Sequence, residues 1–137
     1  MEKNKRITII NNIDQLPTLA EQIEQIADEW ELDPMLAMNM NLVIEEAITN
    51  VIFYAFNDQE NHQIDIDFNL NDSILKLVIT DDGTPFDPTQ KGDPDTTLSV
   101  EDRQIGGLGI FLIRKIMNEV KYKRKNNKNI LTLTKSI

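Results

Sequence analysis

Two segments in the first half of the chain carry apolar residues at helical spacing. The first follows a short strand expected at 5–10, and Thr18 and Glu21 match a capping box at its start. The second opens after Asp33 and is expected to run over 35–56. One face of each helix should therefore pack into a core. The two stripes are Leu16, Leu19, Ile23, Ile26 and Trp30, then Leu36, Met40, Val43, Ala47, Val51 and Tyr54.

The second half of the chain alternates apolar and polar residues, the pattern of strands with one buried face. Strands are expected from Gln63 to about residue 70 and over 74–80, joined by a turn at 71–73. A glycine-led helix follows, and 121–135 reads as a last hairpin that turns at Asn126-Asn127. The order β-α-α-β-β-α-β-β predicts one sheet covered on one face by helices.

Composition narrows the classes of partner. The chain has 137 residues, 40% of them hydrophobic, which suits a single domain over 1–137. Its formal charge of −9 disfavours nucleic acid or anionic lipid, and the one basic run, 121–128, reads as a solvated strand pair and turn. The chain lacks cysteine and any apolar run of the ~18 residues that a membrane span needs. We therefore expect a cytoplasmic domain with no direct nucleic-acid or membrane contact.

Two polar residues interrupt the inner face of the second helix. Glu46 and Asn50 lie four residues apart, so they share one face. A carboxylate can accept a proton from a hydroxyl or water, and an amide oxygen is a hard ligand suited to Mg²⁺. The pair therefore fits phosphoryl transfer or hydrolysis. Alternatively, Glu45 and Glu46 are an exposed pair and Asn50 is a polar residue with its partners satisfied.

A carboxylate also ends an apolar strand row. Period-two alternation places Asp81 on the same face as Ile79, toward the helices, and Asp82 on the other face. Gly83 follows and breaks the strand. Asp81 could accept a hydrogen bond from the exocyclic amine of adenine, although Asp-Gly is also a common pair in a plain turn.

A long segment without periodicity separates this strand from the next helix. Loops of such length are usually functional or disordered, and residues 84–105 fit a lid over a ligand. The sequence GGLGI follows at 106–110, where glycine backbone and a helix N-terminus would together form an anion site. Close strand–helix packing is the alternative explanation of these glycines.

These segments resemble a known family in order and spacing. EEAITN, DDGTPFDP and IGGLGI with FLIRKIMNEV are similar to the N, G1 and G2 boxes of the GHKL (Bergerat) ATP-binding fold of gyrase-type ATPases and histidine kinases. The closest likeness is to bacterial anti-sigma factor serine kinases, and it covers residues 7–135. The resemblance implies an α+β fold: a two-layer α/β sandwich whose mixed, mainly antiparallel sheet is covered on one face by helices, with an ATP lid at about 84–105.

The resemblance also implies roles for individual residues. Glu46 would be the general base, Asn50 would hold Mg²⁺, and Asp81 would accept from the adenine amine, with Gly83 allowing the purine to approach. Arg103, in the lid, would reach the terminal phosphate. The G2 box would supply phosphate-lining glycines, Gly106, Gly107 and Gly109, and two residues that pack beside the lid, Leu108 and Ile110.

The chain departs from the family at two places. Many relatives carry histidine where this chain has Tyr54, which we interpret as a packing residue. Near the C-terminus the family often has a threonine that reaches adenine through water, and here Asn129 or Thr132 could substitute. The only histidine, His62, is assigned no role.

The implied function is an ATP- and Mg²⁺-dependent protein-serine kinase that acts as an anti-sigma factor. Its implied partners are a sigma factor, which it sequesters, and a small anti-anti-sigma antagonist of the STAS type, whose serine it phosphorylates. Relatives commonly dimerise, so a homodimer is expected. The alternatives are a partner-switching module that binds ATP without significant kinase activity and, less favoured, a simple ATPase.

Overall fold

The computed structural model describes residues 2–90 and 107–137, so the predicted site residues Arg103 and Gly106 and lid residues 91–105 lie outside the described part. The described elements follow the predicted order. They are β1 (Glu2–Ile10), a 3₁₀ turn η1 (Ile13–Gln15), α1 (Leu16–Glu29), α2 (Pro34–Tyr54), β2 (Gln63–Asn71), β3 (Ile74–Asp81), a 3₁₀ turn η2 (Pro88–Gln90), α3 (Gly107–Ile116), β4 (Glu119–Lys125) and β5 (Lys128–Ser136).

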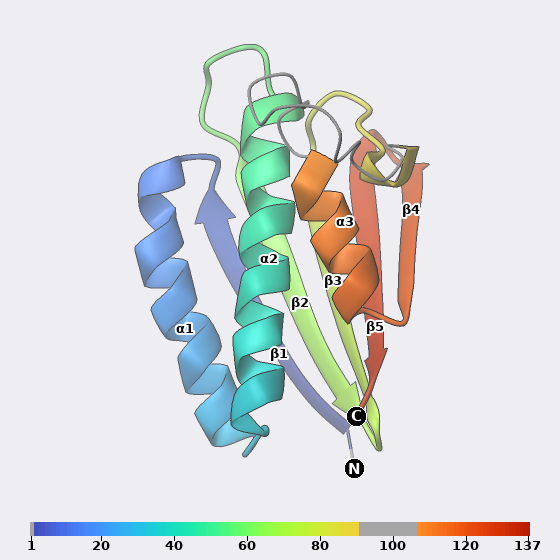
Figure 1. Ribbon diagram of the computed structural model, residues 1–137. Coiled ribbons are helices and arrows are strands. Elements are labelled where there is room, and N and C mark those ends of the chain that lie inside the picture. Colours follow the sequence, from blue (N-terminus) through green and yellow to red (C-terminus); the bar gives the residue numbers. More distant parts are fainter. Residues whose placement is uncertain (1, 91–106) are drawn as a thin grey trace.

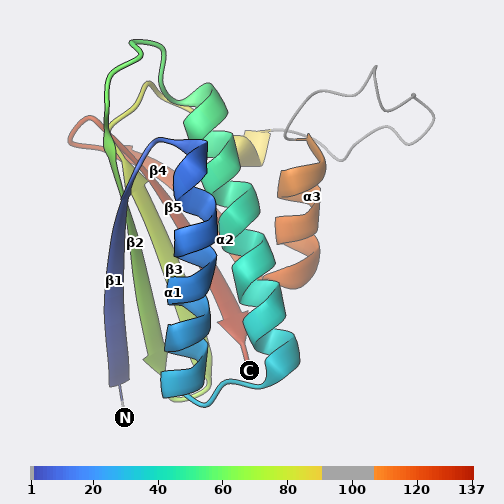
Figure 2. The same cartoon turned by 90° about the vertical axis from the view of Figure 1, so that its left-hand side faces the viewer.

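The strands form one five-stranded sheet in the order β1-β2-β3-β5-β4. All four neighbouring pairs are antiparallel, so the described sheet is wholly antiparallel rather than mixed. The three helices lie side by side over one face of the sheet, with α2 between α1 and α3 (Figure 1). The turned view separates the layers, sheet on one side and helices on the other (Figure 2). The two-layer α+β architecture is confirmed.

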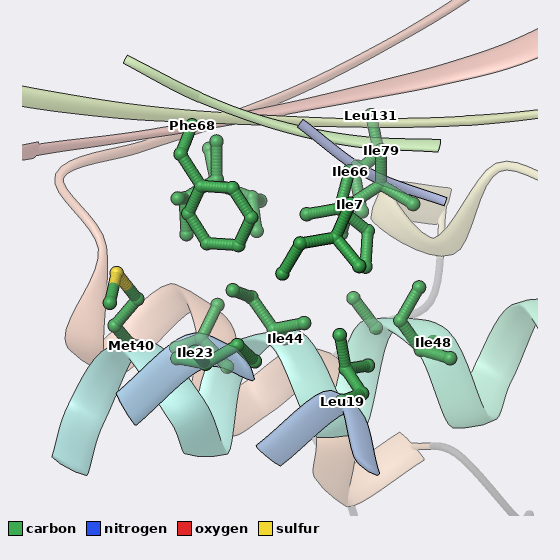
Figure 3. Close-up of a cluster of buried hydrophobic side chains, with 14 of the residues drawn as sticks. Ile7, Leu19, Ile23, Met40, Ile44, Ile48, Ile66, Phe68, Ile79 and Leu131 are labelled. Atoms are coloured by element: carbon green, nitrogen blue, oxygen red, sulfur yellow. The ribbon is translucent and has the colours of Figure 1, made fainter. Parts of the chain in front are cut away.

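The core fills the space between these layers. Apolar side chains of the inner sheet face, such as Ile66 and Phe68, point toward Ile23 of α1 and Met40 and Ile44 of α2 (Figure 3). Phe68 is 1% exposed and Ile44 is fully buried. The predicted stripes therefore pack as expected, because helical and strand periodicity each bring their apolar residues to the shared interface.

The two long helices begin differently. The Asp33 carboxylate caps α2, accepting hydrogen bonds from the backbone N–H groups of Met35 at 3.0 Å and Leu36 at 3.4 Å. The predicted capping box of Thr18 and Glu21 is wrong. Helix α1 already begins at Leu16, continuing from the turn η1, so Thr18 lies inside the helix and cannot cap it.

Residues with positive φ close the last hairpin. Asn126 and Asn127 have φ of 55° and 61°, the left-handed geometry of a two-residue hairpin turn. The basic run is therefore a strand pair and turn, as predicted. No described helix is long and apolar enough to cross a membrane.

Candidate functional site

The start of α3 packs directly against the two polar residues of α2. A Cβ added to Gly109 would lie 2.9 Å from Glu46 Oε2 and 3.3 Å from Asn50 Nδ2. A side chain at this position would displace the end of the Glu46 side chain, so glycine lets the helix start and these polar groups lie close together. Glu46 and Asn50 therefore share one face of α2, as the sequence predicted, and that face meets the glycine-led helix start. Helix α3 begins at Gly107, inside the glycine cluster.

Asn50 is buried, and its side chain has no partner among the described residues. It is 5% exposed, and its side chain forms no hydrogen bond with any residue in 2–90 or 107–137. An unpaired buried amide is costly, so such a group points to a ligand. Glu46 is half-buried, and burial, followed by the neighbouring charge of Glu45, raises the pKa of the Glu46 carboxyl. A raised pKa brings a carboxylate closer to the range in which a general base works at neutral pH.

Asp81 lies at the other end of the site, on the inner face of β3 as predicted, and is 3% exposed. Both of its hydrogen bonds fall on one oxygen, Oδ1, which accepts from the Gly83 N–H and from Asn129 Nδ2, each at 2.9 Å. Burial raises the pKa of Asp81, while these two bonds act in the opposite direction. The other oxygen, Oδ2, has no hydrogen bond within the described ranges, which leaves an acceptor for a ligand.

A close contact between two backbone segments requires glycine at position 83, and the sequence alone did not show this contact. A Cβ at this position would lie 2.4 Å from the backbone oxygen of Ala55, at the end of α2. That same oxygen accepts a hydrogen bond from the Thr84 N–H at 2.7 Å. The glycine therefore lets the strand end approach the helix end, which adds a packing role to the predicted role of admitting a purine.

A small cavity joins the two ends of the site. Its walls include Asn50, Asp81 and Asn129, and its free volume is about 10 Å³, room for about one water molecule. Phe86 also lines it and stacks on Tyr54, with ring centroids 5.5 Å apart. Tyr54 is thus a packing residue, as interpreted from the sequence. A purine would enter only if these side chains moved outward.

Some predicted residues do not join this site. Thr132 is wrong as an adenine contact, because it lies on the outer face of β5, opposite to the face of Asn129 and Leu131. Ile110 is fully buried in the core. Leu108 belongs to α3, but its side chain lies outside the described part.

Sequence reasoning missed a group of hydrogen bonds around Asn129. The Asn129 Oδ1 accepts from the Tyr122 hydroxyl, from Arg124 Nη1 at 3.1 Å and from the Phe86 N–H at 3.2 Å. Arg124 also donates to the Gly83 carbonyl at 2.7 Å. The available signal was an amide on an otherwise apolar strand face.

His62, to which no role was assigned, joins two loops. Its Nδ1 lies 3.0 Å from Asp82 Oδ1 and its Nε2 lies 2.8 Å from Asp58 Oδ2. Its ring also stacks on Phe56, with centroids 4.5 Å apart. Only a doubly protonated ring can donate from both nitrogens, so the arrangement favours the charged imidazolium.

Comparison with known proteins agrees with this geometry. Residues 9–135 match the family model described as the histidine kinase-like ATPase domain. The chain belongs to this family. Membership implies ATP binding and confirms the predicted resemblance.

Two relatives are named as protein kinases. The serine/threonine-protein kinase BtrW of Bordetella bronchiseptica is 33% identical over 114 residues, 82% of this chain and 79% of that protein. The serine-protein kinase RsbW of Listeria monocytogenes is 36% identical over 87 residues, 61% of this chain and 55% of that protein. The match therefore spans about half the length of RsbW. These relatives support serine kinase activity at the level of the family.

A solved structure supports the fold. The chain resembles the structure of the RsbU and RsbW domains of Rv1364c from Mycobacterium tuberculosis with a TM-score of 0.71 and 15% identity. The match covers 98% of this chain and 32% of that chain. At this identity the likeness concerns the fold alone.

The chain's own residues fit the ligand that the family implies. The buried amide of Asn50 and the Oδ2 of Asp81 both lack partners among the described residues. Between them, the first turn of α3 approaches Glu46 through a glycine. An amide oxygen suits Mg²⁺ and backbone N–H groups at a helix start suit phosphate, so ATP with Mg²⁺ matches this set of donors and acceptors.

Proposed function

We propose that this protein is an ATP-dependent protein-serine kinase that acts as an anti-sigma regulatory factor. The observation that carries the proposal is the placement of Glu46 beside the unpartnered Asn50, against the glycine-led start of α3. A module that only bound ATP would need a pocket, but it would not need a half-buried carboxylate at the phosphate end. The pair therefore favours phosphoryl transfer over binding alone.

Glu46 acts as the general base. Its carboxylate takes the proton of the substrate serine hydroxyl while that oxygen forms a bond to the γ-phosphorus and the bond to the ADP oxygen breaks. When bound, ATP supplies the phosphoryl group and Mg²⁺ offsets the charge that develops on its oxygens. Since burial raises the pKa of Glu46, the rate should fall on the acid side at a higher pH than for an exposed glutamate.

The remaining residues hold the nucleotide. Asn50 offers its amide oxygen to Mg²⁺, and the backbone at Gly107 and Gly109 offers N–H groups to the phosphates. Asp81 accepts from the exocyclic amine through Oδ2. Arg103 and Gly106 complete the phosphate end in this proposal, and Leu108 packs beside the lid at 84–105, whereas Ile110 belongs to the core.

The partners in this proposal are proteins. The kinase holds a sigma factor inactive, and it phosphorylates the serine of a small STAS-type antagonist, which breaks the antagonist's own binding to the kinase. A homodimer in the cytoplasm is the proposed form. The formal charge of −9 suits protein partners better than nucleic acid.

The test compares Glu46→Gln with Glu45→Gln. The two residues are neighbours on α2 and lose the same charge, but Glu45 is exposed and Glu46 is half-buried at the site. The purified protein is incubated with labelled ATP, Mg²⁺ and STAS-type proteins encoded in the same genome, and phosphoserine is measured. Glu46→Gln should lower transfer by about 10²- to 10⁴-fold, the usual contribution of a general base, while Glu45→Gln stays near the wild-type rate.

ATP affinity is measured for the same variants. Both should bind ATP within about threefold of wild type, because the change removes a base and not a nucleotide contact. Transfer by Glu46→Gln at the wild-type rate would refute the assignment of the base. Wild-type protein that binds ATP but phosphorylates none of the antagonists would instead favour the binding module.

A further inference from the structure

We propose that Asn129 is the positioning residue for purine recognition: it holds the Asp81 carboxylate by one oxygen and thereby aims the other at the exocyclic amine. The inference rests on the proposed function, since it concerns how the same nucleotide is selected. It goes further because it places the selectivity in a residue of β5 that would not itself touch the ligand.

The register of the sheet brings the two residues together. Asp81 on β3 pairs with Asn129 on β5, and Asn129 pairs in turn with Arg124 on β4. Asn129 is 4% exposed and lies on the same inner face as Asp81. Both side chains line the small cavity between α2, α3 and the sheet.

The hydrogen-bonding capacity of Asn129 is used up. Its amide nitrogen has two N–H donors, and these go to Asp81 Oδ1 at 2.9 Å and to the Thr84 carbonyl at 2.8 Å. Its amide oxygen already accepts from Tyr122, Arg124 and the Phe86 backbone. Asn129 therefore has no free amide donor for a ligand, and it acts on the nucleotide through the groups that it holds, chiefly Asp81.

Asp81 is left with one acceptor at a defined place. Because Asn129 and the Gly83 N–H both bind Oδ1, the carboxylate cannot rotate without breaking two bonds. Its Oδ2 accepts from no residue in 2–90 or 107–137, so this oxygen is left for a ligand. An acceptor there selects an amine over a carbonyl at the same position of a purine. The bond from Asn129 also opposes the effect of burial, which raises the pKa of Asp81 and would otherwise favour the protonated form.

The same amide fastens the segment that follows the strand. Its bonds to the Thr84 carbonyl and from the Phe86 N–H attach both ends of 84–86 to β5. A hydroxyl at this position has one donor, so threonine could hold either Asp81 or Thr84 but not both. Asparagine can therefore donate to Asp81 and to Thr84 at the same time, whereas threonine could make only one of these two hydrogen bonds.

The experiment measures selection between ATP and ITP, which carries a carbonyl in place of the exocyclic amine. The readout is the ratio of the two Kd values, ITP over ATP, at one pH and one Mg²⁺ concentration. Wild type should favour ATP by about 10- to 100-fold, the range for a hydrogen bond to a charged acceptor. Asp81→Asn, which keeps the shape but replaces the free acceptor by a donor, should bring the ratio to one or below.

The variants of the proposed network should follow in a graded order. Asn129→Ala should reduce the ratio to about threefold or less, and Asn129→Thr should give an intermediate ratio, because the amide donors are lost wholly or in part. Tyr122→Phe removes one donor to Asn129 and should lower the ratio by about twofold. Thr134→Val, on the outer face of the same strand, is the matched control and should keep the wild-type ratio.

The ratio separates positioning from simple support of the fold. A structural defect would weaken ATP and ITP equally, and equal weakening in Asn129→Thr would overturn the inference. Should Asn129→Ala fail to give a cooperative thermal transition, Asn129→Thr decides, and a ratio within about 1.5-fold of wild type overturns the inference. The proposed function fails separately if wild type binds no ATP. An unchanged ratio in Asp81→Asn would overturn the inference, because Asp81 would then not be the group that selects the amine.

Discussion

The two sides of the core differ in what they bury. Where α1 packs over β1 and β2, the buried side chains are apolar, among them Leu19, Ile23 and Phe68. The three buried polar residues of the described part, Asn50, Asp81 and Asn129, instead line one cavity between α2, α3 and the sheet. The apolar side stabilises the fold by burying area, whereas the polar side buries two groups, the Asn50 amide and Asp81 Oδ2, that have no hydrogen-bond partner among the described residues.

Removing the largest fully buried side chain of the apolar side should give the largest effect on stability. Phe68 is 1% exposed on β2, so Phe68→Ala should lower the free energy of unfolding by about 3–5 kcal/mol through lost burial and a cavity. Urea denaturation measures the change. The ratio of ITP to ATP affinity in the folded protein should not change, and a changed ratio would break the division between the two sides.

Gly109→Ala should affect catalysis and leave stability intact. The added Cβ would meet the Oε2 of Glu46, the flexible end of a side chain, so Glu46 would move instead of the backbone. Displacing the base by about 1 Å can cost about 10²-fold in rate. Phosphoserine formation should fall accordingly while the melting temperature stays the same or rises, since alanine is the better helix former. A wild-type rate would show that Glu46 is not placed as proposed.

Gly83→Ala is the matched change at the other end of the site. Unlike Gly109→Ala, it should lower the stability of the fold. Here the added Cβ would meet the backbone oxygen of Ala55 at 2.4 Å, and backbone cannot move aside cheaply. We expect a loss of about 1–3 kcal/mol in unfolding free energy, the usual cost of overpacking. Thermal and urea unfolding of the two glycine variants, measured side by side, checks the contrast. Equal melting temperatures would contradict it.

The smallest effect concerns His62, at the edge of the site. Its hydrogen bond to Asp58, supported by Asp82, raises the pKa of the imidazole. The folded state then binds the proton more tightly than the unfolded chain, so the stabilisation is complete below the unfolded pKa of about 6.5 and is lost as pH rises through the folded pKa.

Unfolding of wild type and His62→Gln, measured at several pH values, tests this linkage. Over a series that starts at about pH 5, where the carboxylates are ionised, the stability advantage of wild type should be greatest at the lowest pH and should shrink as pH rises. An advantage that is the same at acidic and alkaline pH would show that the two carboxylates do not hold the charged ring.

Several features of the site could be predicted because they follow from local periodicity. The spacing of four between Glu46 and Asn50 places them on one helix face, and strand alternation places Asp81 inward. The same reasoning could have excluded Thr132, because Asn129 and Thr132 differ by an odd number of residues and so lie on opposite faces of β5. The prediction for Thr132 was wrong because it followed a family motif and not the alternation of side chains along the strand.

The capping box was a local error. The turn η1 leads directly into α1 at Leu16, and Pro17 in the first turn is a local sign of a helix start before Thr18.

The need for glycine at position 83 could not be predicted because it depends on a contact between distant segments. The end of α2 at Ala55, 28 residues earlier in the chain, lies against Gly83, and this contact does not follow from the residues around either position.

The sequence by itself determined which segments are helices and strands, which face of each is apolar, and which polar residues interrupt those faces, because side-chain direction repeats with the local backbone. Only the tertiary structure decided that Asn129 lies opposite Asp81 and that Gly109 lies against Glu46 and Asn50. Strand register and helix packing determine these contacts, and both result from how the whole core packs together.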